Sequence, residues 1–199
     1  MCNDCKNHQL TQRGEIKNLY LQTVQYMTQG YSIRLRERLH IRFKSAEEIR
    51  AVTGTPIDGR VLGFYSPKTH QLWIEGRGPR ISMQATLAHE LTHVWQYDNL
   101  PLRRLRAKLP KATREQTMLR ILEGHAVYVE IDVMRRLHEN NYADFMHALS
   151  MLRNDEYGIG YRWIKDLMEA KQSEGSYKNA FYAMLEIAED IIAGKVAPP

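Results

Sequence analysis

The sequence predicts an α+β protein in which a small antiparallel sheet packs on a mainly helical body. Segments of alternating apolar and polar residues are confined to the first 80 residues, whereas the chain beyond them has apolar residues at helical spacing. The 199 residues are 43% hydrophobic and 26% charged, which is typical of a globular protein. We therefore expect one domain over residues 1–199, with a flexible tail over residues 1–10.

The N-terminal part is expected to contain a helix, a strand and a second, short helix. Apolar residues at helical spacing predict a helix over residues 11–29. Strict alternation of apolar and charged residues over Ile33–Phe43 predicts a strand. Ser45 and Glu48 have the spacing of a capping box, so a short helix begins here, and Gly54 ends it.

A β-hairpin is expected next. Turn residues over 53–59 precede two short strands over residues 60–66 and 71–75, which four turn residues join. Glycines over 76–79 break the second strand, and Ser82 is the expected N-cap of the helix that follows.

The second half of the chain is expected to be helical. Pro101 and Pro110 interrupt the chain first, and a glycine-containing break is expected at Asp155–Gly160. The expected helices cover residues 113–139, 142–152, 161–171 and 176–193.

Charge and hydropathy exclude some partners. The net charge is +5, and part of the excess lies in the basic stretch Leu102–Arg120. Because no aromatic residues interleave these cations as stacking platforms, we interpret the stretch as a solvated connector and expect no nucleic acid partner. No run approaches the roughly 18 apolar residues of a membrane span, and the N-terminus shows no secretory signal. We expect a cytoplasmic protein without a membrane partner.

Cysteine usage excludes a disulfide framework, because Cys2 and Cys5 are the only cysteines. With His8 they supply three ligands for a second metal, but no fourth ligand lies nearby. We favour a frayed, reduced terminus and leave metal binding by Cys2 and Cys5 open.

The strongest motif is His89-Glu90-Leu-Thr-His93, the H-E-x-x-H pattern of zinc hydrolases. On a helix the two histidines lie about 40° apart, close enough to bind one ion. They project nearly opposite an apolar stripe, with Glu90 between the two faces. We therefore expect a helix that is buried on one side and open to a cleft on the other. The stripe consists of Met83, Leu87, Leu91, Val94 and Trp95.

A catalytic zinc site needs a third protein ligand. A histidine six residues after His93 would complete one known arrangement, but that position is Asn99. A carboxylate from a later helix is the other option, and Glu123 is the favoured candidate. Glu130 and His125 remain alternatives, although His125 points roughly 200° away from Glu123 on a helix.

The remaining chemistry needs a base and an oxyanion donor. Glu90 is suited to accept the proton of a zinc-bound water and to pass it to the leaving amine. Tyr157, Tyr161 and His125 are the candidates for the oxyanion donor, and spacing does not choose among them.

Four pieces of the chain resemble a known peptidase family. They are Gly78–Arg80, Leu87–Trp95, Glu123-Gly124 and Tyr157–Arg162, within the last two-thirds of the chain. This set is similar to the peptidase domain of the LIM-domain-containing, ubiquitin-activated plant growth-regulator peptidases. Those are gluzincin-type zinc enzymes with bacterial relatives.

The resemblance implies a zincin-like fold, with a strand at the rim of the active-site helix. It implies His89, His93 and Glu123 as zinc ligands, Glu90 as the catalytic acid and base, and Tyr157–Arg162 near the cleft. The sequence contains no complete LIM domain and no recognisable ubiquitin-interacting helix, so ubiquitin activation and the family's substrates are not carried over.

We therefore expect a zinc metallopeptidase, an endopeptidase that binds a peptide or protein substrate along the hairpin edge. Two alternatives stay open. One is a zincin-like binding module with a structural or vestigial metal. The other is a zinc hydrolase of non-peptide amides or esters.

Overall fold

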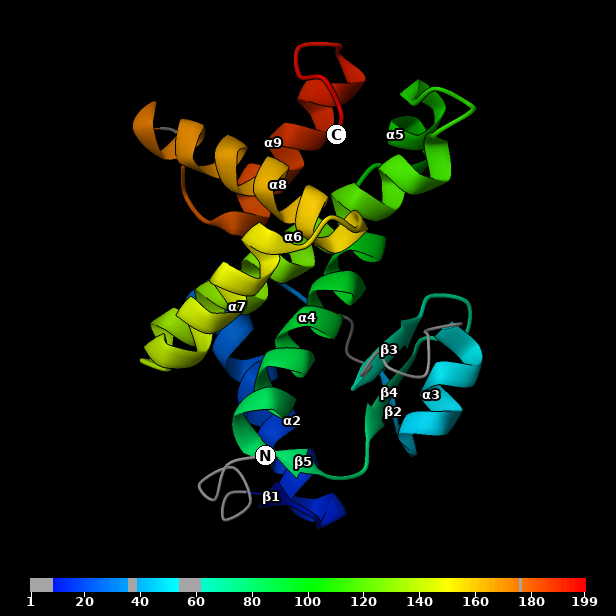
Figure 1. The fold of residues 1–199 in the computed structure, drawn as a ribbon, viewed down its shortest axis with the longest axis vertical. Coiled ribbons are helices and arrows are strands. Elements are labelled where there is room, and N and C mark those ends of the chain that lie inside the picture. Colours follow the sequence, from blue (N-terminus) through cyan, green and yellow to red (C-terminus); the bar gives the residue numbers. More distant parts are fainter. Residues whose placement is uncertain (1–8, 36–38, 54–61, 176) are drawn as a thin grey trace. The chain divides into compact units, whose positions relative to one another are not determined.

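The computed structural model describes residues 9–35, 39–53, 62–175 and 177–199. The chain divides into two compact units, Met1–Val94 and Trp95–Pro199, and the boundary falls inside helix α4 (Arg80–Asn99). Helices predominate and the strands are short, which confirms the α+β class (Figure 1). Every helix in the described ranges is too short or too polar to cross a membrane. The single domain and the cytoplasmic location stay predictions.

Two helices of the first unit form as expected. Helix α2 (Arg13–Gly30) buries its apolar face. Helix α3 (Ala46–Thr53) begins with the expected capping box: Ser45 Oγ accepts from Glu48 N at 3.2 Å, and Glu48 Oε2 accepts from Ser45 N at 2.8 Å. The expected helix end at Gly54 and most of the expected loop lie outside the described residues.

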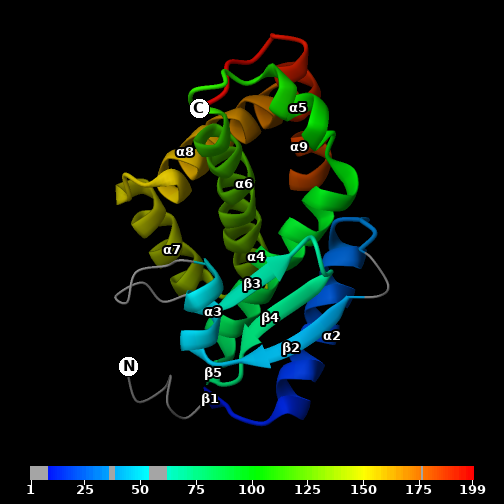
Figure 2. The ribbon, with the colours of Figure 1, turned by 90° about the vertical axis from the view of Figure 1, so that its right-hand side faces the viewer.

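The sheet of the first unit has three strands in the order β2-β4-β3 (Figure 2). Strands β3 (Gly63–Ser66) and β4 (Gln71–Glu75) form the expected antiparallel hairpin. Strand β2 (His40–Lys44) pairs with β4 in parallel, so the expectation of an antiparallel sheet is wrong for this pair. Along the chain α3 and β3 separate β2 from β4, and this long connection lets β4 return to the sheet parallel to β2.

Strand β2 is much shorter than the alternating pattern. The sequence predicts a strand over 33–43, but residues 33–35 and residue 39 are not in a strand, and the described pairing starts at His40; residues 36–38 lie outside the described residues. Strand β4 explains the difference, because its five residues offer a ladder only to His40–Lys44. An alternating pattern shows that a segment can form a strand. The length of the neighbouring strand then decides how many of its residues are paired.

The entry to α4 also differs from expectation. Strand β5 (Gly78–Pro79) pairs with β1 (Gln9–Leu10), two residues expected in the flexible tail. Helix α4 follows β5 directly at Arg80, so Ser82 lies inside the helix and is not its N-cap. The candidate ligands Cys2, Cys5 and His8 lie outside the described residues.

The second unit is helical, and α6 is its central element. Helix α6 packs against α7, α8 and α9, most extensively against α8 (Figure 1). The helices are α5 (Leu102–Lys108), α6 (Arg114–Arg136), α7 (Asn140–Leu152), α8 (Glu156–Ser173) and α9 (Ala180–Ile192).

Helix α5 lies in the stretch expected to be a basic connector. Pro101 is its N-cap residue. Arg104 forms an ion pair with Glu189 of α9 at 2.9 Å, and Arg106 pairs with Glu115 of α6. Part of the positive charge is therefore neutralised within the unit.

Helix α8 begins where the sequence predicts a break. The side chain of Asp155 caps the helix, because its Oδ1 accepts from Gly158 N at 3.0 Å. Gly160 lies inside the helix at the crossing with α6. A Cβ atom at Gly160 would lie 2.0 Å from Arg120 O, and one at Gly124 would lie 2.2 Å from Gly160 C. These two glycines therefore allow the backbones of α6 and α8 to touch.

Helix α9 starts later than expected, at Ala180. Its N-cap is Asn179, whose Oδ1 accepts from Phe181 N at 3.0 Å and from Tyr182 N at 2.9 Å. This cap explains why the helix begins at Ala180.

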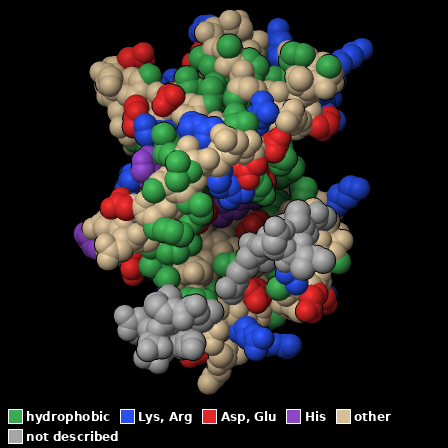
Figure 3. Space-filling view, viewed as in Figure 1, with side chains coloured by type: hydrophobic (Ala, Val, Ile, Leu, Met, Phe, Trp, Pro, Cys, Tyr) green, Lys and Arg blue, Asp and Glu red, His purple; other side chains and the backbone are tan. Residues whose placement is uncertain are grey.

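Helix α7 leaves apolar side chains exposed. Phe145 is 62% exposed and Leu152 is 80% exposed, with Leu149 between them. Hydrophobic side chains gather over α7 on the face drawn in Figure 3. Apolar spacing therefore predicts this helix correctly, although part of its apolar face is exposed.

The helix crossing yields a stability prediction. Gly160→Ala should lower the free energy of unfolding by about 1–3 kcal/mol, because the new methyl group collides with the α6 backbone. Urea denaturation measures the change. Gly14→Ala is the matched control, because nothing lies within 4 Å of a Cβ atom there, and stability should be kept or slightly raised. Equal stability of Gly160→Ala and the unmodified protein would contradict the close crossing.

Candidate metal centre

The apolar stripe of helix α4 is buried, as the sequence predicts, whereas the cleft expected on its other side stays a prediction. The five residues of its apolar stripe are at most 3% exposed: Met83, Leu87, Leu91, Val94 and Trp95. Their burial fixes the rotation of the helix about its own axis, and this rotation directs His89 and His93 away from the stripe.

The two imidazoles converge on one point. His89 Nε2 and His93 Nε2 lie 3.2 Å apart, and the rings meet edge to face with centroids 4.9 Å apart. Two nitrogens bound to one tetrahedral zinc at 2.0–2.1 Å would be about 3.3 Å apart. The geometry of the first two ligands therefore already fits a shared metal ion.

Glu123 of α6 is the third member of a possible metal site. Within the part of the chain that the structure describes, ligand atoms of His89, His93 and Glu123 all lie within 4.8 Å of one another. We call these three residues the metal-ligand group. It contains neither Glu130 nor His125, the alternatives considered from the sequence.

Gln96 holds the turn of α6 that carries Glu123. Its Nε2 donates to Leu122 O at 2.8 Å and lies 3.0 Å from His125 Nδ1. Leu122 and His125 flank Glu123, and Gln96 follows His93 by three residues on α4. The side chain is completely buried. Gln96 was missed in the sequence, where a glutamine beside an apolar stripe carries no signal of its partners.

His125 belongs to the core of the second unit. Its ring is fully buried, with its centroid 5.9 Å from that of Trp95 and 5.5 Å from that of Phe181. The acceptor Nδ1 faces Gln96. This placement agrees with the helical projection, in which His125 points away from Glu123.

Glu90 lies beneath the edge strand β3. The residue is 7% exposed. A Cβ atom at Gly63 would lie 2.9 Å from Glu90 Cγ and 2.7 Å from Thr86 Cγ2, so the β3 backbone runs directly against this turn of α4. Only glycine fits at position 63 without displacement.

The two tyrosines considered as oxyanion donors contact a residue of α7 and the residue that follows it, Arg153. Tyr161 is 2% exposed, and its hydroxyl lies 2.6 Å from His147 Nδ1. Burial is the main reason why the pKa of Tyr161 is raised to about 12. The ring of Tyr157 lies under the Arg153 guanidinium at 4.9 Å. A catalytic role for either tyrosine stays a prediction.

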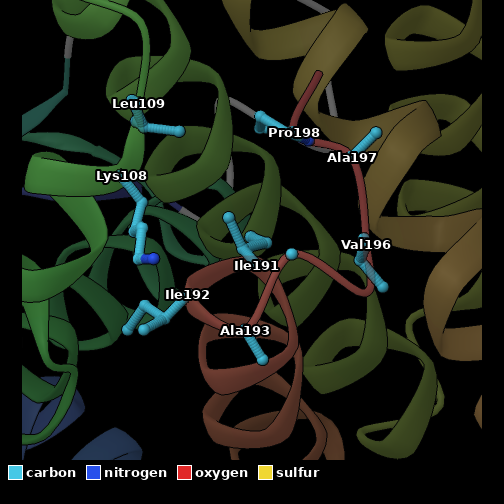
Figure 4. Close-up of a pocket in the computed structure, with 9 residues that line it drawn as sticks. Lys108, Leu109, Ile191, Ile192, Ala193, Val196, Ala197 and Pro198 are labelled. Carbon is cyan, nitrogen blue, oxygen red and sulfur yellow. The ribbon is translucent and has the colours of Figure 1, made fainter.

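A cavity in the second unit is separate from these residues. It has a volume of about 350 Å³ and lies where α5 and α9 end (Figure 4). Its lining includes Lys108, Leu109, Ile191 and Pro198 but no member of the metal-ligand group.

Comparisons with known proteins found no match. The chain matches no protein-family model, no curated protein and no solved structure. Inference about function therefore depends on the geometry of the metal-ligand group and its surroundings.

The role of Gln96 can be tested by Gln96→Leu. This change leaves two buried acceptors without their donor and should lower the free energy of unfolding by about 1–3 kcal/mol. It should also weaken metal binding at least about tenfold, because Glu123 loses the support of its neighbours. Thermal unfolding and competition with a chelator measure the two effects. Gln116→Leu removes an exposed bond to Glu156 and should change neither; equal effects of both variants would contradict this role.

Proposed function

We propose that the protein is a zinc-dependent peptidase of the gluzincin type, with a zincin-like fold. The observation that carries this proposal is the metal-ligand group, whose two histidines lie on the helix that also presents Glu90. The donor set is two imidazole nitrogens and one carboxylate oxygen, which is typical of catalytic zinc. Calcium and magnesium prefer oxygen ligands and fit this set less well.

The number of ligands supports catalysis over a structural role. A structural zinc site is closed by four protein ligands, whereas a catalytic site keeps one position for water. Among the described residues the group has three members. This count favours a hydrolase over a binding module with a structural metal.

Glu90 is the general base and acid of the proposed reaction. Zinc, when bound, lowers the pKa of a coordinated water towards about 7 and polarises the substrate carbonyl. Glu90 accepts a proton from the attacking water as the new C–O bond forms. It then donates this proton to the amine nitrogen as the C–N bond breaks.

Strand β3 is the proposed binding edge for an extended peptide. In the order β2-β4-β3 it lies at the end of the described sheet, and its first residue, Gly63, contacts the turn of Glu90. A peptide that pairs with this edge would pass directly beside the base. Such pairing uses backbone groups in the middle of a chain, so we propose an endopeptidase.

The metal site is tested by metal analysis of the purified protein. We expect about one zinc ion per chain, and we expect His89→Ala to lose it while the protein stays folded. His40→Ala is the control, because His40 is an exposed histidine of β2 outside the metal-ligand group. A folded protein that binds no zinc would contradict the proposal.

The catalytic step is tested by Glu90→Gln. This variant should keep the zinc and lose at least about 100-fold in the rate of peptide cleavage, because the amide cannot accept the proton. Mass spectrometry of a digested peptide library measures the cleavage. Glu139→Gln, an exposed change at the start of α7, should have no effect. Unchanged cleavage by Glu90→Gln would exclude Glu90 as the base, and hydrolysis of esters but not of peptides would indicate a different substrate class.

A further inference from the structure

Tyr97 lies on the face of α4 that carries the histidines. On a helix it projects about 40° from His93 and about 80° from His89, whereas Glu90 projects about 100° from His89. Helical side chains lean towards the helix N-terminus, so the side chain of Tyr97 is directed towards the turn that holds His93. This direction points the phenol towards the metal-ligand group.

The exposure of Tyr97 differs from that of its neighbours. Tyr97 is 44% exposed, whereas Trp95 is 3% exposed and Gln96 is completely buried. The two neighbours pack into the core of the second unit. Tyr97 is therefore on the side of α4 that a ligand can reach.

Tyr97 also lies within the electrostatic influence of Glu123. Burial raises the pKa of its hydroxyl above the ordinary value, and the negative charge of Glu123 raises it further. A phenol hydroxyl can donate a hydrogen bond.

We propose that Tyr97 donates its O–H to the substrate oxygen that becomes negatively charged during hydrolysis at the metal-ligand group. This inference rests on the proposed function and supplies its missing oxyanion donor. When water attacks a peptide carbonyl, negative charge develops on the oxygen, and a donor aimed at that position lowers the barrier.

Two of the other candidates, Tyr161 and His125, are buried, whereas Tyr97 is 44% exposed. The hydroxyl of Tyr161 is directed to His147, and the ring of His125 is buried between Trp95 and Phe181. Tyr97 is on the metal-binding helix itself, where the rotation that directs the histidines also directs the phenol.

The test compares Tyr97→Phe with Tyr182→Phe in the zinc-loaded full chain. Tyr182, on α9, is a matched control because it is 41% exposed and its ring contacts Lys178. Tyr97→Phe should keep its zinc and its KM for a cleaved peptide while kcat falls roughly 100-fold. The control should match the unmodified protein. An unchanged kcat, or loss of zinc in Tyr97→Phe, would overturn the proposal.

A second measurement does not depend on peptide cleavage. Inorganic phosphate is a tetrahedral oxyanion, and its binding to the cobalt-substituted protein can be followed in the visible spectrum of the metal. Tyr97→Phe should bind phosphate about tenfold more weakly, because a charged hydrogen bond is lost. Equal affinity of both proteins, or no binding to either, would overturn the role of Tyr97. If phosphate binding depends on Tyr97 but no peptide is cleaved, the peptidase proposal fails and the donor role stands.

Discussion

The approach of two imidazole nitrogens to 3.2 Å on one helix is the interaction on which the candidate site depends. Helical spacing brings His89 and His93 close, but the burial of Leu87 and Leu91 on the opposite side fixes where they point. A rotation of α4 that exposed these leucines would cost about 1.5–3 kcal/mol for each. The packing of the core therefore also fixes the geometry of the two histidines.

The third ligand depends on how α6 is held in the second unit. Gln96 bonds the turn that contains Glu123, and on another side of α6 the glycine crossing brings α8 to backbone contact. Gly124 directly follows Glu123, so the residue that allows the close crossing is adjacent to the ligand. All three candidate ligands lie on helices and not on loops.

Local patterns predicted the helices well and the strand pairings less well. Apolar spacing predicts α2, α6 and α7 to within a few residues, because a helix forms its hydrogen bonds within itself. The strand over 33–43 is shortened to β2 because its partner is short. The break expected at Asp155–Gly160 is a helix start, because glycine there serves a helix crossing that no local pattern reveals.

The sequence by itself determined the two-faced helix, the pair of histidines, the base between the faces and a carboxylate in the next long helix. Each follows from the period of the α-helix, which is a local property. Only the tertiary structure decided that Glu123 joins the histidines, that His125 turns into the core, and that Gln96 bonds the turn of α6 that carries Glu123. These facts depend on which atoms of distant segments meet, and packing, not helical period, sets those distances.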